Sequence, residues 1–192
     1  MSRPLPVPTL SEALAGRPLS SAHPGALVVA LGQRVAGDDG AGLAVLDELR
    51  RRVLPQDVEL RSLAEASSLV PLLETRRLVI VVDAVVGPEP GAVLVLSPAD
   101  LARGSAMSVS SHGIGVGQAV ELARTLYGEA LSSRIDIVGI AIAPPNRYAE
   151  GISPVIQAAV GSAVALVFRS LTGEKPWVPS SLAKPESRSR DA

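Results

Sequence analysis

Carboxylates and an imidazole stand in three polar segments, each beside a predicted strand or helix. Asp38 and Asp39 lie in the Gly-rich segment 37–42, Asp83 comes directly after Val81-Val82, and His112 lies in the Ser/Gly-rich segment 110–113. Carboxylate oxygens and an imidazole nitrogen together suit a zinc or nickel ion. The chain contains no cysteine, which excludes thiol catalysis, iron–sulfur ligation and cysteine-based zinc sites. A metal site here must therefore use His, Asp or Glu.

Each of these residues also has a simpler structural explanation. Asp38 or Asp39 could accept the free N–H groups at the start of the helix that follows them. Asp83 could form a turn at the end of its strand, and His112 could be a solvated loop histidine. The residue types alone leave both kinds of explanation open.

The elements that must position these residues alternate between short apolar runs and helical patterns. This alternation is typical of a parallel sheet that is buried on both faces. We therefore expect an α/β fold, a three-layer α/β/α domain with a mostly parallel central sheet of about five strands. The expected strands are 26–31, 58–63, 78–82, 91–96 and 135–142. The expected helices begin at Gly42, at Ser67, at about Ile114 and at Ser153.

The details of these patterns predict how the elements are arranged. Leu43, Leu46, Leu49 and Val53 fall on one helical stripe after Gly42. The uniformly apolar run 78–82 predicts a central strand that stops at Asp83. The link 87–90 is too short for a helical crossover, so strand 91–96 is expected to lie antiparallel at an edge. Ligands of such sheets bind outside the carboxyl ends of the strands, which is where the Asp-containing segments would lie.

Composition indicates how the chain is divided into domain and tails and which class of partner is excluded. The chain has 192 residues, a formal net charge of −1 and 47% hydrophobic residues, as expected for one globular domain. Residues 1–25 hold five of the sixteen prolines and predict a flexible leader without a signal peptide or membrane span. The domain is expected at 26–173 and a disordered tail at 174–192. Near-neutral charge and 2% aromatic residues argue against nucleic-acid binding.

Four segments together resemble the maturation endopeptidases of nickel-iron hydrogenases. Their order and spacing match that family over roughly residues 26–171. The segments are Leu31 to Gly42 with its Asp38-Asp39 pair, Val81-Val82-Asp83-Ala84, Ser111-His112-Gly113-Ile114-Gly115 and Ile137-Val138-Gly139-Ile140.

The resemblance implies a metal-dependent endopeptidase of the cytoplasm. Such an enzyme cuts a C-terminal extension from the hydrogenase large subunit precursor after nickel has been inserted. The resemblance assigns Asp39, Asp83 and His112 as catalytic residues and metal ligands, with Asp38 in an auxiliary role. The implied metal is the nickel of the precursor or a zinc ion. Neither nucleic acid nor membrane insertion is expected.

The sequence departs from the family pattern at three places, and these departures keep a second hypothesis open. Ala30 stands where the family has Gly, and Gln33 where it has Asn. Ser62-Leu63-Ala64-Glu65 replaces an Asp-Gly-Gly-Thr segment. The alternative is a non-catalytic metal-binding or maturation chaperone module of the same fold. The enzyme requires Asp39, Asp83 and His112 to converge, whereas the binding module does not.

Overall fold

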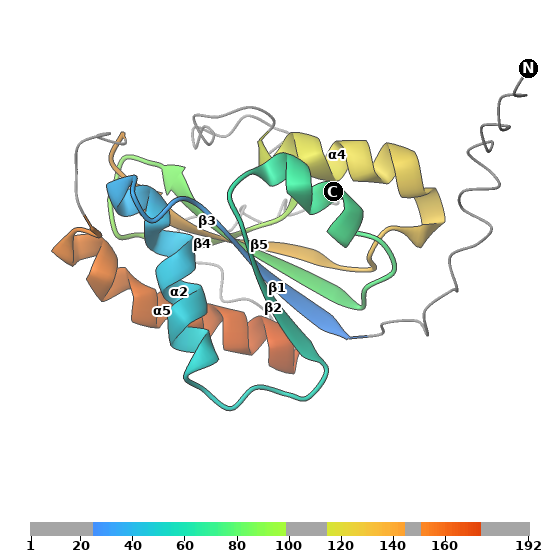
Figure 1. The fold of residues 1–192 in the computed structure, drawn as a ribbon, viewed down its shortest axis with the longest axis horizontal. Helices are drawn as coiled ribbons and strands as arrows, with labels where there is room; N and C mark the ends of the chain where they lie inside the picture. The colour runs from blue at the N-terminus through green and yellow to red at the C-terminus, as the bar shows by residue number, and fades with distance from the viewer. Residues whose placement is uncertain (1–24, 99–114, 145–150, 174–192) are drawn as a thin grey trace, which may run out of the picture.

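A computed structural model describes residues 25–98, 115–144 and 151–173 (Figure 1). His112, the expected tail and all of the expected leader except Gly25 lie outside these residues. The described chain forms a five-stranded sheet with the strand order β2-β1-β3-β5-β4. The strands are β1 (Ala26–Leu31), β2 (Val58–Leu63), β3 (Leu78–Val86), β4 (Val93–Leu96) and β5 (Ile135–Ile142).

The pairing of the strands confirms the expected topology. Strands β2, β1, β3 and β5 run parallel to one another, and β4 pairs antiparallel with β5. Strand β3 is central and β4 lies at an edge, as their sequences predicted. Each crossover between parallel strands leaves room for a helical segment on one face of the sheet.

Helical segments cover both faces of this sheet (Figure 1). Helices α2 (Ala41–Arg50) and α5 (Pro154–Thr172) pack on one face. The 3-10 helix η2 (Ala66–Leu72) and helix α4 (Val116–Tyr127) pack on the other, and the short η3 (Gly128–Ala130) follows α4. Alternate residues of β1 enter the two cores, because successive side chains of a strand point to opposite faces. The molecule therefore has the expected three-layer α/β/α fold.

Helix α5 is the one helix in the described ranges that is long and apolar enough to cross a membrane by length and composition. Its buried residues pack with the sheet and α2 in one hydrophobic core. The buried apolar residues of α5 in this core are Ile156, Ala159, Val160, Ala163, Val164, Val167 and Leu171. The apolar character of α5 thus reflects its position as a core helix.

The structure corrects three details of the sequence predictions. Strand β3 does not stop at Asp83 but continues to Val86, because the apolar residues after Asp83 also pair with β5. Helix α2 ends at Arg50, so Val53 is not on its buried stripe and is 95% exposed. The helix expected at 67–74 is the 3-10 helix η2, which contains Pro71. Proline has no N–H to donate and so disfavours a continuous α-helix there.

Candidate active site

The turn after β1 brings Asp39 back over the end of its own strand. Gly32 has a φ of +127°, which a residue with a side chain rarely adopts. A Cβ at this position would lie 2.1 Å from the Asp39 carbonyl oxygen. The chain then forms a tight turn, in which the Ala36 N–H donates to the Gln33 carbonyl oxygen at 3.1 Å, and enters the 3-10 helix η1 (Gly37–Gly40). Gly32 thus permits the close return that places Asp39 beside the strand end.

A second glycine sets the distance between helix α2 and the sheet. A Cβ on Gly42 would lie 2.6 Å from the Leu31 carbonyl oxygen and 2.7 Å from that of Val82. The first turn of α2 therefore rests directly on the ends of β1 and the middle of β3. This contact brings η1, which immediately precedes α2, close to Asp83.

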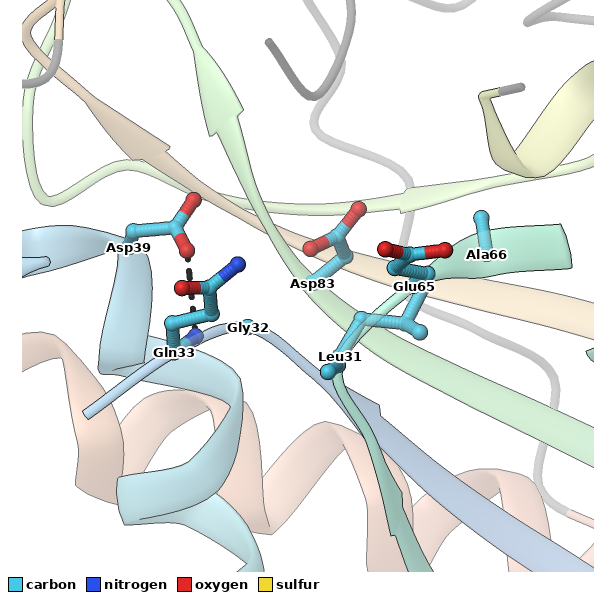
Figure 2. Close-up of a pocket in the computed structure, with 8 residues that line it drawn as sticks. Leu31, Gly32, Gln33, Asp39, Glu65, Ala66 and Asp83 are labelled. Atoms are coloured by element: carbon cyan, nitrogen blue, oxygen red, sulfur yellow. Dashed lines mark hydrogen bonds between the residues drawn. The ribbon is translucent and has the colours of Figure 1, made fainter. Parts of the chain in front are cut away.

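Asp39 and Asp83 line one pocket at the carboxyl edge of the sheet. The remaining lining residues come from the end of β1 and from the segments that follow β1 and β2: Leu31, Gly32, Gln33, Ala64, Glu65 and Ala66. Figure 2 shows the Asp83 carboxylate between those of Asp39 and Glu65 in this view. The Asp39 carboxylate accepts a hydrogen bond from the Gln33 N–H at 3.1 Å. Two of the three predicted ligands are thus brought together.

The electrostatics of this pocket act most strongly on Asp83. Asp83 is 6% exposed and lies in the middle of β3, opposite Gly139 of β5. Burial, and secondly the negative charge of Asp39, raise the pKa of Asp83 to about 7, although the Ala84 N–H opposes this rise by hydrogen bonding. A carboxyl group with a pKa near neutrality can take up and release a proton at physiological pH.

The donor set of the pocket fits a divalent cation in part. Carboxylate oxygens are suitable ligands for zinc and nickel, and a cation would relieve the repulsion between Asp39 and Asp83. Within the described ranges, however, no three His, Asp or Glu side chains are grouped closely enough to hold a metal. His112, the third predicted ligand, lies outside those ranges. Asp39 and Asp83 alone therefore do not make up a ligand set within the described ranges.

The simpler explanations for the acidic residues are wrong for three positions. Neither η1 nor α2 receives a side-chain cap, so Asp38 and Asp39 do not cap the helix that follows them. Instead, the Asp38 carboxylate accepts hydrogen bonds from the Ser153 N–H at 2.6 Å and the Ser153 hydroxyl at 2.9 Å. Asp83 forms no turn, because its strand continues on both sides.

Sequence reasoning missed two residues of this region. Glu65 lines the pocket at its exposed rim. It follows β2, so the rule that selected residues after β1 and β3 could also have selected Glu65. Ser153 is 115 positions away from Asp38, and no spacing in the sequence indicates their contact.

Comparisons with known proteins identify the family. A model of the hydrogenase maturation protease family matches residues 44–170, a segment that includes Asp83 and His112 and begins after Asp39. A search of curated proteins gives no significant match.

Solved structures share the fold. The hydrogenase maturating endopeptidase HybD of E. coli is 22% identical with a TM-score of 0.65, over 79% of this chain and 94% of that one. The [NiFe] hydrogenase maturation protease HycI of Thermococcus kodakarensis is 22% identical with a TM-score of 0.58, over 78% and 93%. The hydrogenase 2 maturation peptidase of Thaumarchaeota archaeon SCGC_AB-539-E09 is 26% identical with a TM-score of 0.53, over 77% and 97%. The chain belongs to the hydrogenase maturation protease family, a family of peptidases.

Proposed function

We propose that this protein is a metal-dependent endopeptidase that removes a C-terminal extension from the nickel-loaded large subunit precursor of a nickel-iron hydrogenase. The observation that carries the proposal is the pairing of Asp39 with the buried Asp83 in one pocket at the carboxyl edge of the sheet. Membership of the maturation protease family supports the same substrate class. The precursor would be processed in the cytoplasm.

In this proposal Asp83 moves the proton that peptide hydrolysis requires. Hydrolysis breaks the C–N bond, adds the water oxygen to the carbonyl carbon and transfers a proton to the leaving amine. The pKa of about 7 belongs to Asp83 in the pocket without a cation, and a bound cation lowers it. The Asp83 oxygen that does not hold the cation would accept a proton from the attacking water and return it to the amine. The buried position of Asp83 keeps its carboxyl fixed relative to Asp39.

Asp39 and Asp83 would hold the cation, together with His112 as the third ligand. The cation is the nickel carried by the precursor or a zinc ion, and when bound it polarises the scissile carbonyl. The Gln33 N–H fixes the Asp39 carboxylate through the hydrogen bond at 3.1 Å. The backbone and not the side chain of Gln33 makes this contact, so the contact does not depend on the Asn that the family pattern has at this position.

The alternative is a non-catalytic metal-binding or maturation chaperone module of the same fold. One observation favours it: Glu65, from the altered segment after β2, places a further carboxylate at the rim of the pocket. A binding module would recognise the nickel-loaded precursor without cutting it. The two functions predict different masses for the large subunit.

The deciding experiment is the intact mass of the large subunit in nickel-replete cells with and without this gene. The proposal predicts that deletion leaves a subunit heavier by a C-terminal peptide. Wild type restores the shorter mass, whereas Asp83→Asn, which keeps the shape of the side chain, does not. Asp57→Asn is the matched control, because Asp57 is exposed and precedes β2 at the opposite edge of the sheet. An unchanged mass after deletion would refute the protease and favour the binding module.

A further inference from the structure

We propose that Asp38 and Ser153 form a latch that holds the η1 turn, and with it Asp39, at the position required over Asp83. This inference deepens the proposed function and rests on it for its catalytic consequence. Asp38 is a positioning residue in this account, since its carboxylate contacts Ser153 and not the pocket. The inference explains why two adjacent carboxylates in one short turn have different partners.

The two carboxylates of η1 accept hydrogen bonds from different partners. Asp39 lines the pocket and accepts the Gln33 N–H. Asp38 accepts two hydrogen bonds from Ser153, one from its N–H and one from its hydroxyl. Because the residues are neighbours, a displacement of the Asp38 carboxylate moves the backbone that carries Asp39.

Apart from the latch, the hydrogen bond from the Gln33 N–H to Asp39 and the continuation into α2, few interactions among the described residues restrain the turn. It is four residues long, and its N-terminal flanking residue, Ala36, provides no side-chain cap. Short 3-10 helices have few internal hydrogen bonds and poor hydrogen-bond geometry. The preceding residues are joined to α2 by an ion pair between Arg34 and Asp47, but the Arg34 side chain is 61% exposed. Ion pairs of this kind contribute little in water.

The partner of the latch is a rigid part of the molecule. Ser153 is the N-terminal flanking residue of α5, and its hydroxyl does not cap its own helix. Pro154 starts the helix with a φ that suits the first turn. Most of the inward face of α5 is buried in the core with α2 and the sheet. The positive end of the α5 dipole also favours a carboxylate at this place.

The latch therefore connects the turn that bears Asp39 to a buried helix more than a hundred residues away in sequence. A shift of about 1 Å in a reacting group is enough to reduce catalysis about a hundredfold. Loss of the Asp38 carboxylate should thus lower the rate of the chemical step, and should weaken binding of the nickel-loaded precursor to a smaller extent, since Asp39 is a proposed ligand of its nickel. The effect should depend on Ser153, because both hydrogen bonds come from that residue.

Two measurements on the full-length protein test the latch. Amide hydrogen exchange of residues 37–42 reports how firmly η1 is held, and steady-state cleavage of the purified nickel-loaded precursor reports kcat and KM separately. Asp38→Ala is expected to speed exchange in this segment about tenfold and to lower kcat about ten- to a hundredfold, with a smaller rise in KM. Asp38→Asn should restore most of both, since its amide oxygen still accepts the Ser153 N–H and its NH2 group can donate to the Ser153 hydroxyl oxygen. Asp57→Ala, the exposed control, should change neither.

Further outcomes distinguish a failure of the latch from a failure of the proposed function. Ser153→Ala should give a smaller effect than Asp38→Ala and add nothing to it in the double variant. Unchanged exchange in Asp38→Ala overturns the latch, and so does faster exchange with the kcat of wild type. If wild type itself fails to cut the precursor, the proposed function falls and the dissociation constant of Ni²⁺ alone replaces kcat. In that case a Ni²⁺ affinity equal in wild type and Asp38→Ala overturns the latch, and a weakened affinity supports it.

Discussion

Replacing Asp83 by Asn should make the free protein more stable at neutral pH, although it removes a proposed catalytic group. Folding raises the pKa of Asp83 from 3.8 to about 7, so the folded state binds this proton more tightly than the unfolded state. The stability that this difference provides is fully present below pH 4 and is lost as the pH rises through about 7. Above that pH the folded protein must hold a buried negative charge next to Asp39.

The size of the effect follows from the same pKa. A value of about 7 in place of 3.8 corresponds to about 4 kcal/mol in the free energy of unfolding. Asn has nearly the shape of Asp, carries no charge, and offers an oxygen to the Ala84 N–H. We therefore expect Asp83→Asn to exceed wild type by up to about 4 kcal/mol at pH 8.5 and to gain nothing at pH 4.

The assay is urea unfolding followed by far-ultraviolet circular dichroism, in EDTA, at four pH values from 4 to 8.5. The informative quantity is the difference between Asp83→Asn and wild type as a function of pH. Asp57→Asn is the control and should show a difference of less than about 1 kcal/mol, since Asp57 is half exposed and its ion pair with Arg77 lies at the surface. Asp39→Asn removes the like charge that helps to raise the pKa of Asp83. In this variant the stability lost between pH 4 and 8.5 should therefore be smaller than in wild type. A difference that is the same at every pH, or a variant that is less stable at pH 8.5, would refute the reasoning.

Three further substitutions test other parts of the structure. Gly42→Ala should lower the free energy of unfolding by at least about 2 kcal/mol in urea, because its Cβ would meet two strand carbonyl oxygens within 2.7 Å; a variant as stable as wild type would mean that α2 does not rest on the sheet as described. Ser132→Ala should cost about 1–3 kcal/mol by thermal unfolding, since the buried hydroxyl donates to the Leu73 carbonyl oxygen at 2.7 Å and accepts from the Arg76 N–H; no loss would show that water replaces these bonds. His112→Ala should abolish precursor cleavage without lowering the unfolding temperature, and a variant that still cuts would remove His112 from the ligand set.

The fold was largely predictable because most of its strands are buried on both faces. Such strands read as continuous apolar runs, and the expected bounds of β1 and β5 agree with the structure. The same signal fails at Asp83, where a single charged residue predicts the end of the strand. The ladder to β5 continues past that residue, so pairing with a neighbouring strand outweighs the local preference of one side chain.

The candidate site was predictable only where chain position decides which residues meet. Asp39 and Asp83 follow or occupy neighbouring parallel strands, and the topology alone brings them to one edge. The partner of Asp38 was not predictable, because Ser153 lies beside it through the packing of α5 against α2. Contacts of that kind depend on how helices pack in three dimensions, which one sequence does not encode in its spacing.

The strand order also has a consequence for biosynthesis. Strand β3 carries Asp83, but one of its two neighbours is β5, which the ribosome makes about fifty residues later. Strand β4 also pairs with β5, and Ser153, the partner of Asp38, is synthesised after β5. A nascent or truncated chain that stops before β5 leaves the Asp83 strand with an open edge and Asp38 without its partner. Completion of the polypeptide and assembly of the pocket are therefore coupled in time.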